Sequence, residues 1–256
     1  MTLVDWLPTL VALAASILTF FSGFGLGTLL LPAFAVFFPI EMAVAMTAAV
    51  HFANNLFKLG LMRQHARWDL VLRFGIPAIV AAFVGAWVLT QLTGLEPLLQ
   101  WDSPIGHATV TWLGLSIGCL LIFFAWQELK PGALGKLIPV RTLPIGGALS
   151  GFFGGLSGHQ GALRSVFLLH TGVDKAAFIG TGVACAVLID AARIATYSSQ
   201  AVFSVDWQSL IGPLAAAMIG ALLGKQLLEK VTLQGIQRLV AVLLVVLGLA
   251  MATGLL

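Results

Sequence analysis

Long apolar segments occupy almost the whole chain. Separated by short polar stretches, they cover residues 5–38, 41–62, 70–93, 106–127, 142–171, 175–197, 207–228 and 233–254. Six of these eight hydrophobic segments have about the length of one membrane-spanning helix, roughly 20 residues. The first and the fifth are too long, because a helix over residues 5–38 would measure roughly 50 Å against a hydrocarbon core of about 30 Å.

Both long segments carry a glycine cluster near the middle. The clusters are SGFGLGTLLLP, from Ser22 to Pro32, and GGALSGFFGGLSGHQGAL, from Gly146 to Leu163. A glycine in a helix interior is less favourable than alanine by about 1 kcal/mol. We therefore predict that each long segment consists of two short half-helices that meet at a glycine-rich break.

Charged residues are too scarce for a soluble enzyme. Only 9% of the 256 residues are Asp, Glu, Lys or Arg, whereas a soluble domain carries roughly a quarter. The chain is therefore predicted to be an all-α polytopic membrane protein that passes several times through the lipid bilayer of the cytoplasmic (inner) membrane. The net charge of +3 comes from basic residues in short loops, which the positive-inside rule explains without a nucleic-acid partner.

The positions of lysine and arginine predict the topology. Nine of the 13 surround the loops after the second, fourth and seventh segments and belong on the cytoplasmic side, namely Arg63, Arg67, Arg73, Lys130, Lys136, Arg141, Lys225, Lys230 and Arg238. The loops after the third and sixth segments contain none and belong outside. Eight simple crossings would put the loops after the fourth and sixth segments on one side. A re-entrant hairpin in the fifth segment removes this conflict, and the same treatment of the first places the N-terminus outside.

The two halves of the chain resemble each other. Ser22-Gly23 recurs as Ser157-Gly158, and most matching positions lie 134 to 137 residues apart. We therefore predict two inverted repeats, residues 1–130 and residues 131–256, each made of a glycine-broken hairpin followed by three transmembrane helices. Inverted repeats with broken helices at the bilayer midplane are a recurrent design of secondary transporters.

Cations and glycines near the breaks predict an anion-binding centre. Arg164 follows the second break, and a cation within the membrane needs an anionic partner or water. Half-helix N-termini at the breaks direct unpaired N–H groups and positive dipole ends toward the centre. The predicted backbone contacts lie around Gly25, Gly27, Gly158 and Gly161. The alternative for these glycines is close helix packing of the small-xxx-small kind.

Four more ionisable residues lie within the segments and are predicted counter-ions or proton carriers, namely His51, Lys58, Asp190 and Arg193. Two of them have simpler explanations. Lys58 lies five residues before Arg63 and could extend its ammonium group to the cytoplasmic interface. Arg193 lies one helical turn after Asp190, and the two charges could neutralise each other.

Polar residues within apolar segments are predicted to donate hydrogen bonds to the anion. They are Thr47, Asn55, His159, Gln160 and Thr181. His51 and Asn55 are four residues apart and share a helix face, so hydrogen bonds between helices are an equal alternative for them. A threonine in a membrane helix also commonly bonds the carbonyl of residue i−4.

Metal-protease, nucleotide-binding and zinc motifs are absent from the sequence. It has no HExxH, no GxxxxGK[ST] and no cysteine pair at zinc spacing. We therefore expect a protein that is not an enzyme and that needs no cofactor and no metal. The rival hypotheses are an intramembrane enzyme that uses His51, Asn55 and His159, and a non-transporting membrane scaffold.

The duplicated glycine hairpins resemble those of the sulfite exporter TauE/SafE family of membrane transporters. The resemblance lies in GFGLGTLLLPAF and Ala45-Met46-Thr47 in one half, and in SGFFGGLSGHQGALRSVFLL and Gly180-Thr181-Gly182 in the other. It implies a permease that moves a small sulfur-containing anion, sulfite or an organosulfonate, across the cytoplasmic membrane. Proton coupling and assembly into a homo-oligomer are both compatible with such a transporter.

Overall fold

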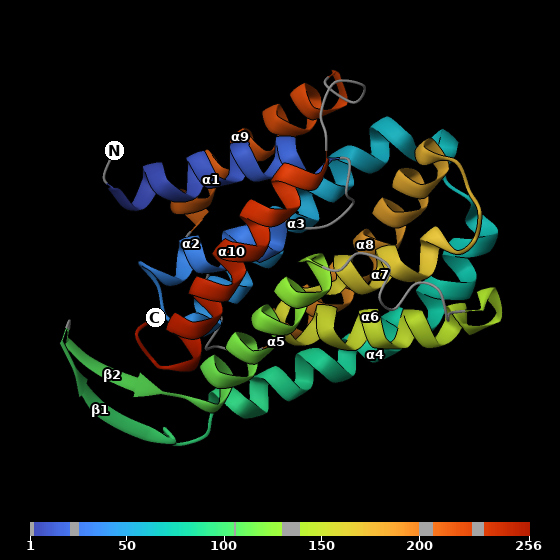
Figure 1. Cartoon of the computed structure of the whole chain (residues 1–256). Coiled ribbons are helices and arrows are strands. Elements are labelled where there is room, and N and C mark those ends of the chain that lie inside the picture. Colours follow the sequence, from blue (N-terminus) through green and yellow to red (C-terminus); the bar gives the residue numbers. More distant parts are fainter. Residues whose placement is uncertain (1–2, 21–25, 105, 130–138, 200–206, 227–232) are drawn as a thin grey trace.

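A computed structural model describes residues 3–20, 26–104, 106–129, 139–199, 207–226 and 233–256 (Figure 1). Its helices are α1 (Leu3–Thr19), α2 (Leu26–Ala35), α3 (Ile40–Met62), α4 (Trp68–Thr93), α5 (Trp112–Leu129), α6 (Leu143–Ser157), α7 (Gln160–Leu169), α8 (Lys175–Ser198), α9 (Trp207–Gln226) and α10 (Leu233–Ala252). Short 3₁₀ turns precede α4 (Arg63–His65) and α6 (Val140–Thr142). Two strands, β1 (Leu99–Ser103) and β2 (Gly106–Val110), complete the described elements.

The helices confirm the prediction of an all-α membrane protein. In the described part of the chain, α4, α8 and α9 are each long and apolar enough to cross a membrane, and several shorter helices are also apolar. Apolar side chains also cover much of the outer surface of the described helices. On α4, for example, Leu72, Ile76 and Val80 are each about 60% exposed. Such a surface suits lipid rather than water.

A β-hairpin stands where the sequence predicted the start of the fourth apolar segment. Residues 106–110 pair in antiparallel fashion with residues 99–103, and helix α5 begins only at Trp112. The hairpin lies beside the C-terminus (Figure 1). The indole nitrogen of Trp101 donates to the carbonyl of Thr253 at 2.9 Å, and the amide of Thr109 donates to the carbonyl of Gly254 at 3.1 Å. These bonds to the end of the chain favour strand over helix.

A break divides the fifth apolar segment at its glycine cluster. Helix α6 ends at Ser157, Gly158 adopts a left-handed conformation with φ +82°, and α7 begins at Gln160. Left-handed glycine is a common way to end a helix. Helix α7 then folds back along α6, because the hydroxyl of Ser150 donates to the carbonyl of Gln160 at 2.7 Å and Gly146 faces the Phe167 ring.

The first long segment also contains two helices, α1 and α2, which pack on each other. Residues 21–25 between them, including Gly25, lie outside the described residues. The predicted contact of Gly25 with an anion therefore remains a prediction.

Glycines allow two helix pairs to pack with their backbones close together. A Cβ atom on Gly147, Gly151 or Gly155 of α6 would lie about 2 Å from a backbone carbonyl oxygen of α4. On α9, Cβ atoms on Gly220 and Gly224 would lie 2.7 and 3.0 Å from backbone carbonyl oxygens of α1, and one on Gly212 would meet the Thr9 side chain. The two pairs lie on opposite sides of the molecule (Figure 1). The alternative explanation of intramembrane glycines as packing residues thus applies to these six positions.

The other helix pairs in close contact lie between the α4–α6 pair and the α1–α9 pair. Helix α5 packs against α10 through Gly118 and Gly248, and α3 packs against α8. Helix α3 also contacts α9, and α4 contacts α8. The polar residues of α3 and α8 face each other where these two helices cross, and this crossing positions the site.

Candidate functional site

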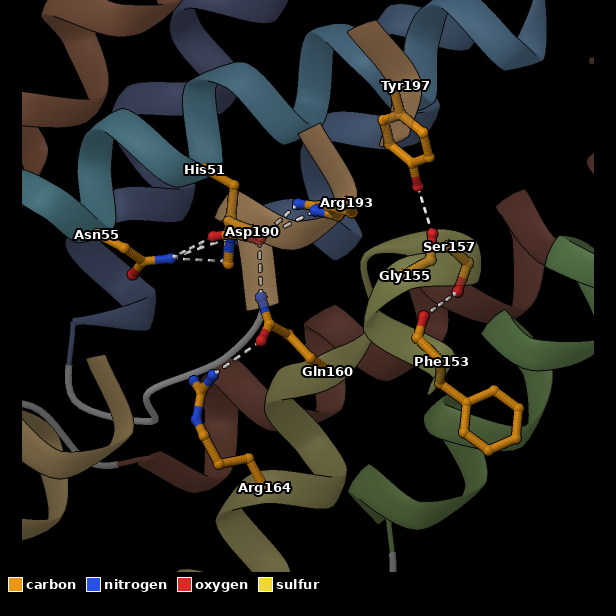
Figure 2. Close-up of polar contacts among 10 residues, drawn as sticks. All are labelled: His51, Asn55, Phe153, Gly155, Ser157, Gln160, Arg164, Asp190, Arg193 and Tyr197. Carbon is orange, nitrogen blue, oxygen red and sulfur yellow. Dashed lines mark hydrogen bonds and ion pairs between the residues drawn. The ribbon is translucent and has the colours of Figure 1, made fainter. Parts of the chain in front are cut away.

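Asp190 of α8 is the centre of a buried polar cluster (Figure 2). Its carboxylate is fully buried and accepts hydrogen bonds from three helices. Asp190 Oδ1 accepts from Gln160 Nε2 of α7 at 2.8 Å and from Arg193 Nε of α8 at 3.0 Å. Asp190 Oδ2 lies 2.7 Å from His51 Nδ1 and accepts from Asn55 Nδ2 at 3.2 Å, both on α3. One carboxylate therefore connects residues from both halves of the chain.

Arg164 extends this cluster along α7. Its Nη1 donates to Gln160 Oε1 at 3.4 Å, one helical turn away, and the residue is only 3% exposed. A Cβ atom on Gly182 of α8 would lie 3.4 Å from the Arg164 Nε. Arg164 therefore lies buried between α7 and α8. Figure 2 shows it below Gln160.

The start of α2 lies close to the second break. A Cβ atom on Gly27 would lie 3.5 Å from the carbonyl oxygen of Gly158, 3.5 Å from the His51 ring and 3.8 Å from the Thr47 side chain. On its other side, Gly158 faces Arg193, since a Cβ atom there would lie 2.6 Å from Arg193 Nη1. The glycine-rich parts of the two halves thus meet at the α3–α8 crossing.

The residues around the second break are held by their own contacts. His159 Nδ1 lies 2.9 Å from Ser157 Oγ, and the imidazole stacks on the Phe124 ring of α5 at 5.6 Å between centroids. The hydroxyl of Tyr197 on α8 donates to the carbonyl of Gly155 (Figure 2). These contacts fix the break against α5 and α8.

Four buried polar atoms near the break have no hydrogen bond of normal geometry within the described structure. They are Thr47 Oγ1, His159 Nε2 and both Nη atoms of Arg193, of which Nη2 forms an ion pair with Asp190 at 2.9 Å. A buried polar group that lacks a partner costs about 1–3 kcal/mol, so such atoms call for an explanation. Here they come from both halves of the chain and lie around the point where Gly27 approaches Gly158.

Cations outnumber carboxylates in this region. Lys58, Arg164 and Arg193 are at most 5% exposed, whereas Asp190 is the buried carboxylate among the described residues. Lys58 is buried and does not extend to the cytoplasmic interface, contrary to one of the two explanations drawn from the sequence. Among the described residues, no three His, Cys, Asp or Glu side chains are placed to hold a metal ion.

Most of the predicted site residues gather here, but Thr181 does not. Its hydroxyl accepts the backbone N–H of Arg67 at 2.9 Å. Thr181 thus lies near the start of α8, beside the loop after α3. Gly161 is buried in the first turn of α7. Sequence reasoning missed Tyr197 and Ser157. Tyr197 is the single tyrosine of the chain, and it follows Arg193 by four residues, which places both on one face of α8.

A family model for "Sulfite exporter TauE/SafE" matches residues 9–251. No curated protein and no solved structure shows a significant match. The matched range takes in both breaks, the α3–α8 crossing and every described member of the buried cluster. The chain therefore belongs to the sulfite exporter TauE/SafE family of membrane transporters.

Proposed function

We propose that the protein is a secondary transporter of a small sulfur oxyanion, sulfite or an organosulfonate, and that the anion binds where Gly27 approaches Gly158. The observation that carries this proposal is the excess of buried positive charge beside buried donors that lack partners. Buried cations are expensive unless an anion compensates them. A substrate anion would supply this missing charge.

The side chains around the break provide the donors that an oxyanion needs. Arg193 Nη1 approaches the meeting point from α8, and the Thr47 side chain approaches it from α3. Ser157 donates to the carbonyl of Phe153, so His159 Nδ1 donates to Ser157, and His159 Nε2 can donate to an anion only in the protonated ring. Charge-assisted hydrogen bonds of this kind are about twice as strong as neutral ones. Arg164, one turn from Gln160, adds a second guanidinium on the α7 side.

The packing of the helices supports two inverted repeats, residues 1–130 and 131–256. If α1–α5 correspond to α6–α10, the pair α4–α6 corresponds to α9–α1, and α4–α8 corresponds to α9–α3. The pairs α3–α8 and α5–α10 correspond to themselves. Such a pattern is expected of a pseudo-two-fold axis through the α3–α8 crossing, where the substrate would lie. Motion of helices related by this axis would give alternating access.

The return of α7 along α6 supports a re-entrant hairpin, since Phe167 near the end of α7 lies against Gly146 near the start of α6. With this hairpin, the basic loops lie in the cytoplasm and the β-hairpin lies outside. His51 and Asp190, 2.7 Å apart at the crossing, are the proposed carriers of any coupled proton.

Flux of sulfite and of an alkanesulfonate into proteoliposomes tests the proposal. We expect Arg164→Gln to reduce the flux at least tenfold, because it removes one buried charge and keeps a polar side chain of similar length. Arg63→Gln, on an exposed residue of the cytoplasmic loop, is the matched control and should transport normally. A wild-type protein that moves neither anion would favour the scaffold or enzyme hypotheses, and normal flux in Arg164→Gln would remove Arg164 from the site.

A further inference from the structure

A small polar pocket lies beside the first helix break, next to the central cluster. Its volume is about 10 Å³, which is close to the space that one water-sized species occupies. The pocket lies between the end of α1, the start of α2, the middle of α3 and one turn of α8. Its lining residues are Thr19, Phe20, Leu26, His51, Asn54, Asn55, Lys58 and Val183.

Lys58 brings a buried positive charge to this pocket. Its ammonium group has three N–H donors. With the Asn54 amide oriented by its partners, the Asn54 oxygen accepts one of them at 3.2 Å, and the Asn54 nitrogen donates to Ala217 at 3.0 Å. The centre of the Phe20 ring lies 5.3 Å from the ammonium nitrogen, and a second N–H donor faces this ring in a cation–π contact. Among the residues that the structure describes, one N–H donor of Lys58 remains for another partner.

No carboxylate among the described residues forms an ion pair with Lys58. Arg164 is a second buried cation, and like charges repel each other. Asp190, the nearest buried carboxylate in the cluster, is already bonded to His51 and Arg193. The pocket side of the cluster therefore carries a positive charge without compensation.

Thr19 provides a second donor to the same pocket. It is the last residue of α1, only 5% exposed, and its hydroxyl has no hydrogen-bond partner in the described structure. A threonine at a helix end commonly bonds the carbonyl four residues earlier, and Thr19 does not. Its hydroxyl lines the pocket together with Lys58.

We infer that this pocket is a second anion site, in which the Lys58 ammonium and the Thr19 hydroxyl bind one halide-sized monovalent anion such as chloride. The small volume of the pocket favours a monatomic ion over a sulfur oxyanion, and the charge of Lys58 disfavours a cation. Lys58 and Arg193 are 135 residues apart and correspond in the two repeats. Each therefore presents a cation to one helix break, Arg193 at Gly158 and Lys58 at the end of α1.

His51 and Asn55 separate the two sites. They line the pocket and also bond Asp190. An anion beside Lys58 would screen its charge from Arg164 without taking any donor from Asp190. The site thus goes beyond the proposed transport function, because it is a resident halide site and not the path of the substrate.

Chloride titration of the purified protein in detergent tests this inference. The protein is held in potassium gluconate, and chloride replaces gluconate at constant ionic strength while the midpoint of thermal unfolding is measured. We expect a saturable rise in the midpoint with chloride, since a ligand that binds the folded state stabilises it. Gluconate is too large for the pocket. A midpoint that does not depend on chloride would overturn the inference.

Two substitutions of Thr19 locate the site. Thr19→Val keeps the shape of the side chain but removes the donor, and we expect it to weaken chloride binding about tenfold, the loss of one hydrogen bond to a charge. Thr19→Ser keeps the hydroxyl and should bind as the wild type does. Lys58→Gln should abolish the chloride response, while Arg63→Gln should leave it intact. Equal chloride affinity in Thr19→Val and Thr19→Ser would overturn the inference, even if Lys58→Gln fails to fold.

Sulfite flux measured in chloride-free gluconate separates this site from the proposed function. Sulfite transport that continues in gluconate, together with chloride binding weakened in Thr19→Val, supports both proposals. Sulfite transport without any chloride response would sink the halide site alone. A chloride response in a protein that moves neither sulfite nor an alkanesulfonate would sink the transport proposal alone.

Discussion

Replacing Asp190 with asparagine should destabilise the protein strongly. The carboxylate accepts from Arg193, Gln160, His51 and Asn55 and has no exposure to solvent. Asparagine has the same shape and still offers one oxygen to Arg193 and Gln160, so the main loss is the negative charge. Removing one partner of a buried ion pair costs about 3–5 kcal/mol, because the other charge stays buried without compensation. We expect a loss of stability of that size.

The free energy of unfolding can be measured by titration with SDS in mixed micelles, for the wild type, Asp190→Asn, Arg193→Gln and the double variant. The double variant removes both charges, so we expect it to be more stable than the sum of the single losses implies, by about 2 kcal/mol. Sulfite should stabilise Asp190→Asn more than the wild type, since the anion replaces the missing charge beside Arg193. Additive losses, or a loss under about 1 kcal/mol in Asp190→Asn, would refute the view of Asp190 as the counter-charge of the site.

Three further outcomes are expected. Gly158→Ala should abolish sulfite flux, because its Cβ atom would lie 2.6 Å from a guanidinium nitrogen of Arg193. Gly172→Ala is the control, because Gly172 also has a positive φ, +70°, but open space around it. It should carry the same backbone strain of about 1–2 kcal/mol and transport normally. Gly151→Ala should lower the yield of folded protein and the thermal midpoint, because its Cβ atom would overlap a carbonyl oxygen of α4; Gly60→Ala, with no atom within 4 Å, should raise the midpoint slightly. A cysteine at Ser103, in a background without native cysteines, should react with an impermeant maleimide added to intact cells, and protection there would reverse the proposed orientation.

The sequence predicts the fold class and the break in the fifth segment because both depend on local composition. Few charges and long apolar runs exclude a soluble fold, and the second glycine cluster lies where α6 ends and α7 begins. The β-hairpin was missed because residues 106–110 read equally well as the start of an apolar helix, and their pairing depends on contacts with the C-terminus.

The central cluster could be predicted in part. The spacing of Asp190 and Arg193 predicts their ion pair, which the structure contains. The contact of Asp190 with Asn55 joins positions 135 residues apart, and no local pattern indicates it. The proposed repeat would provide such a signal, since residues that correspond across a two-fold axis meet when they lie near that axis. Thr47 and Thr181 also match in spacing, but Thr181 lies nearer the start of α8 than Asp190, where its hydroxyl accepts the backbone N–H of Arg67.

The backbone contact between α4 and α6 has a consequence for the moving parts of the transporter. Gly147, Gly151 and Gly155 approach carbonyl oxygens of α4 at every helical turn, so these two helices cannot slide past each other without a backbone clash. Helix α4 belongs to the first half of the sequence and α6 to the second. Any rigid body that moves during transport must therefore contain pieces of both halves. Residues 1–130 expressed alone would leave the glycine-facing side of α4 uncovered, and functional protein should form only when the two fragments fold together.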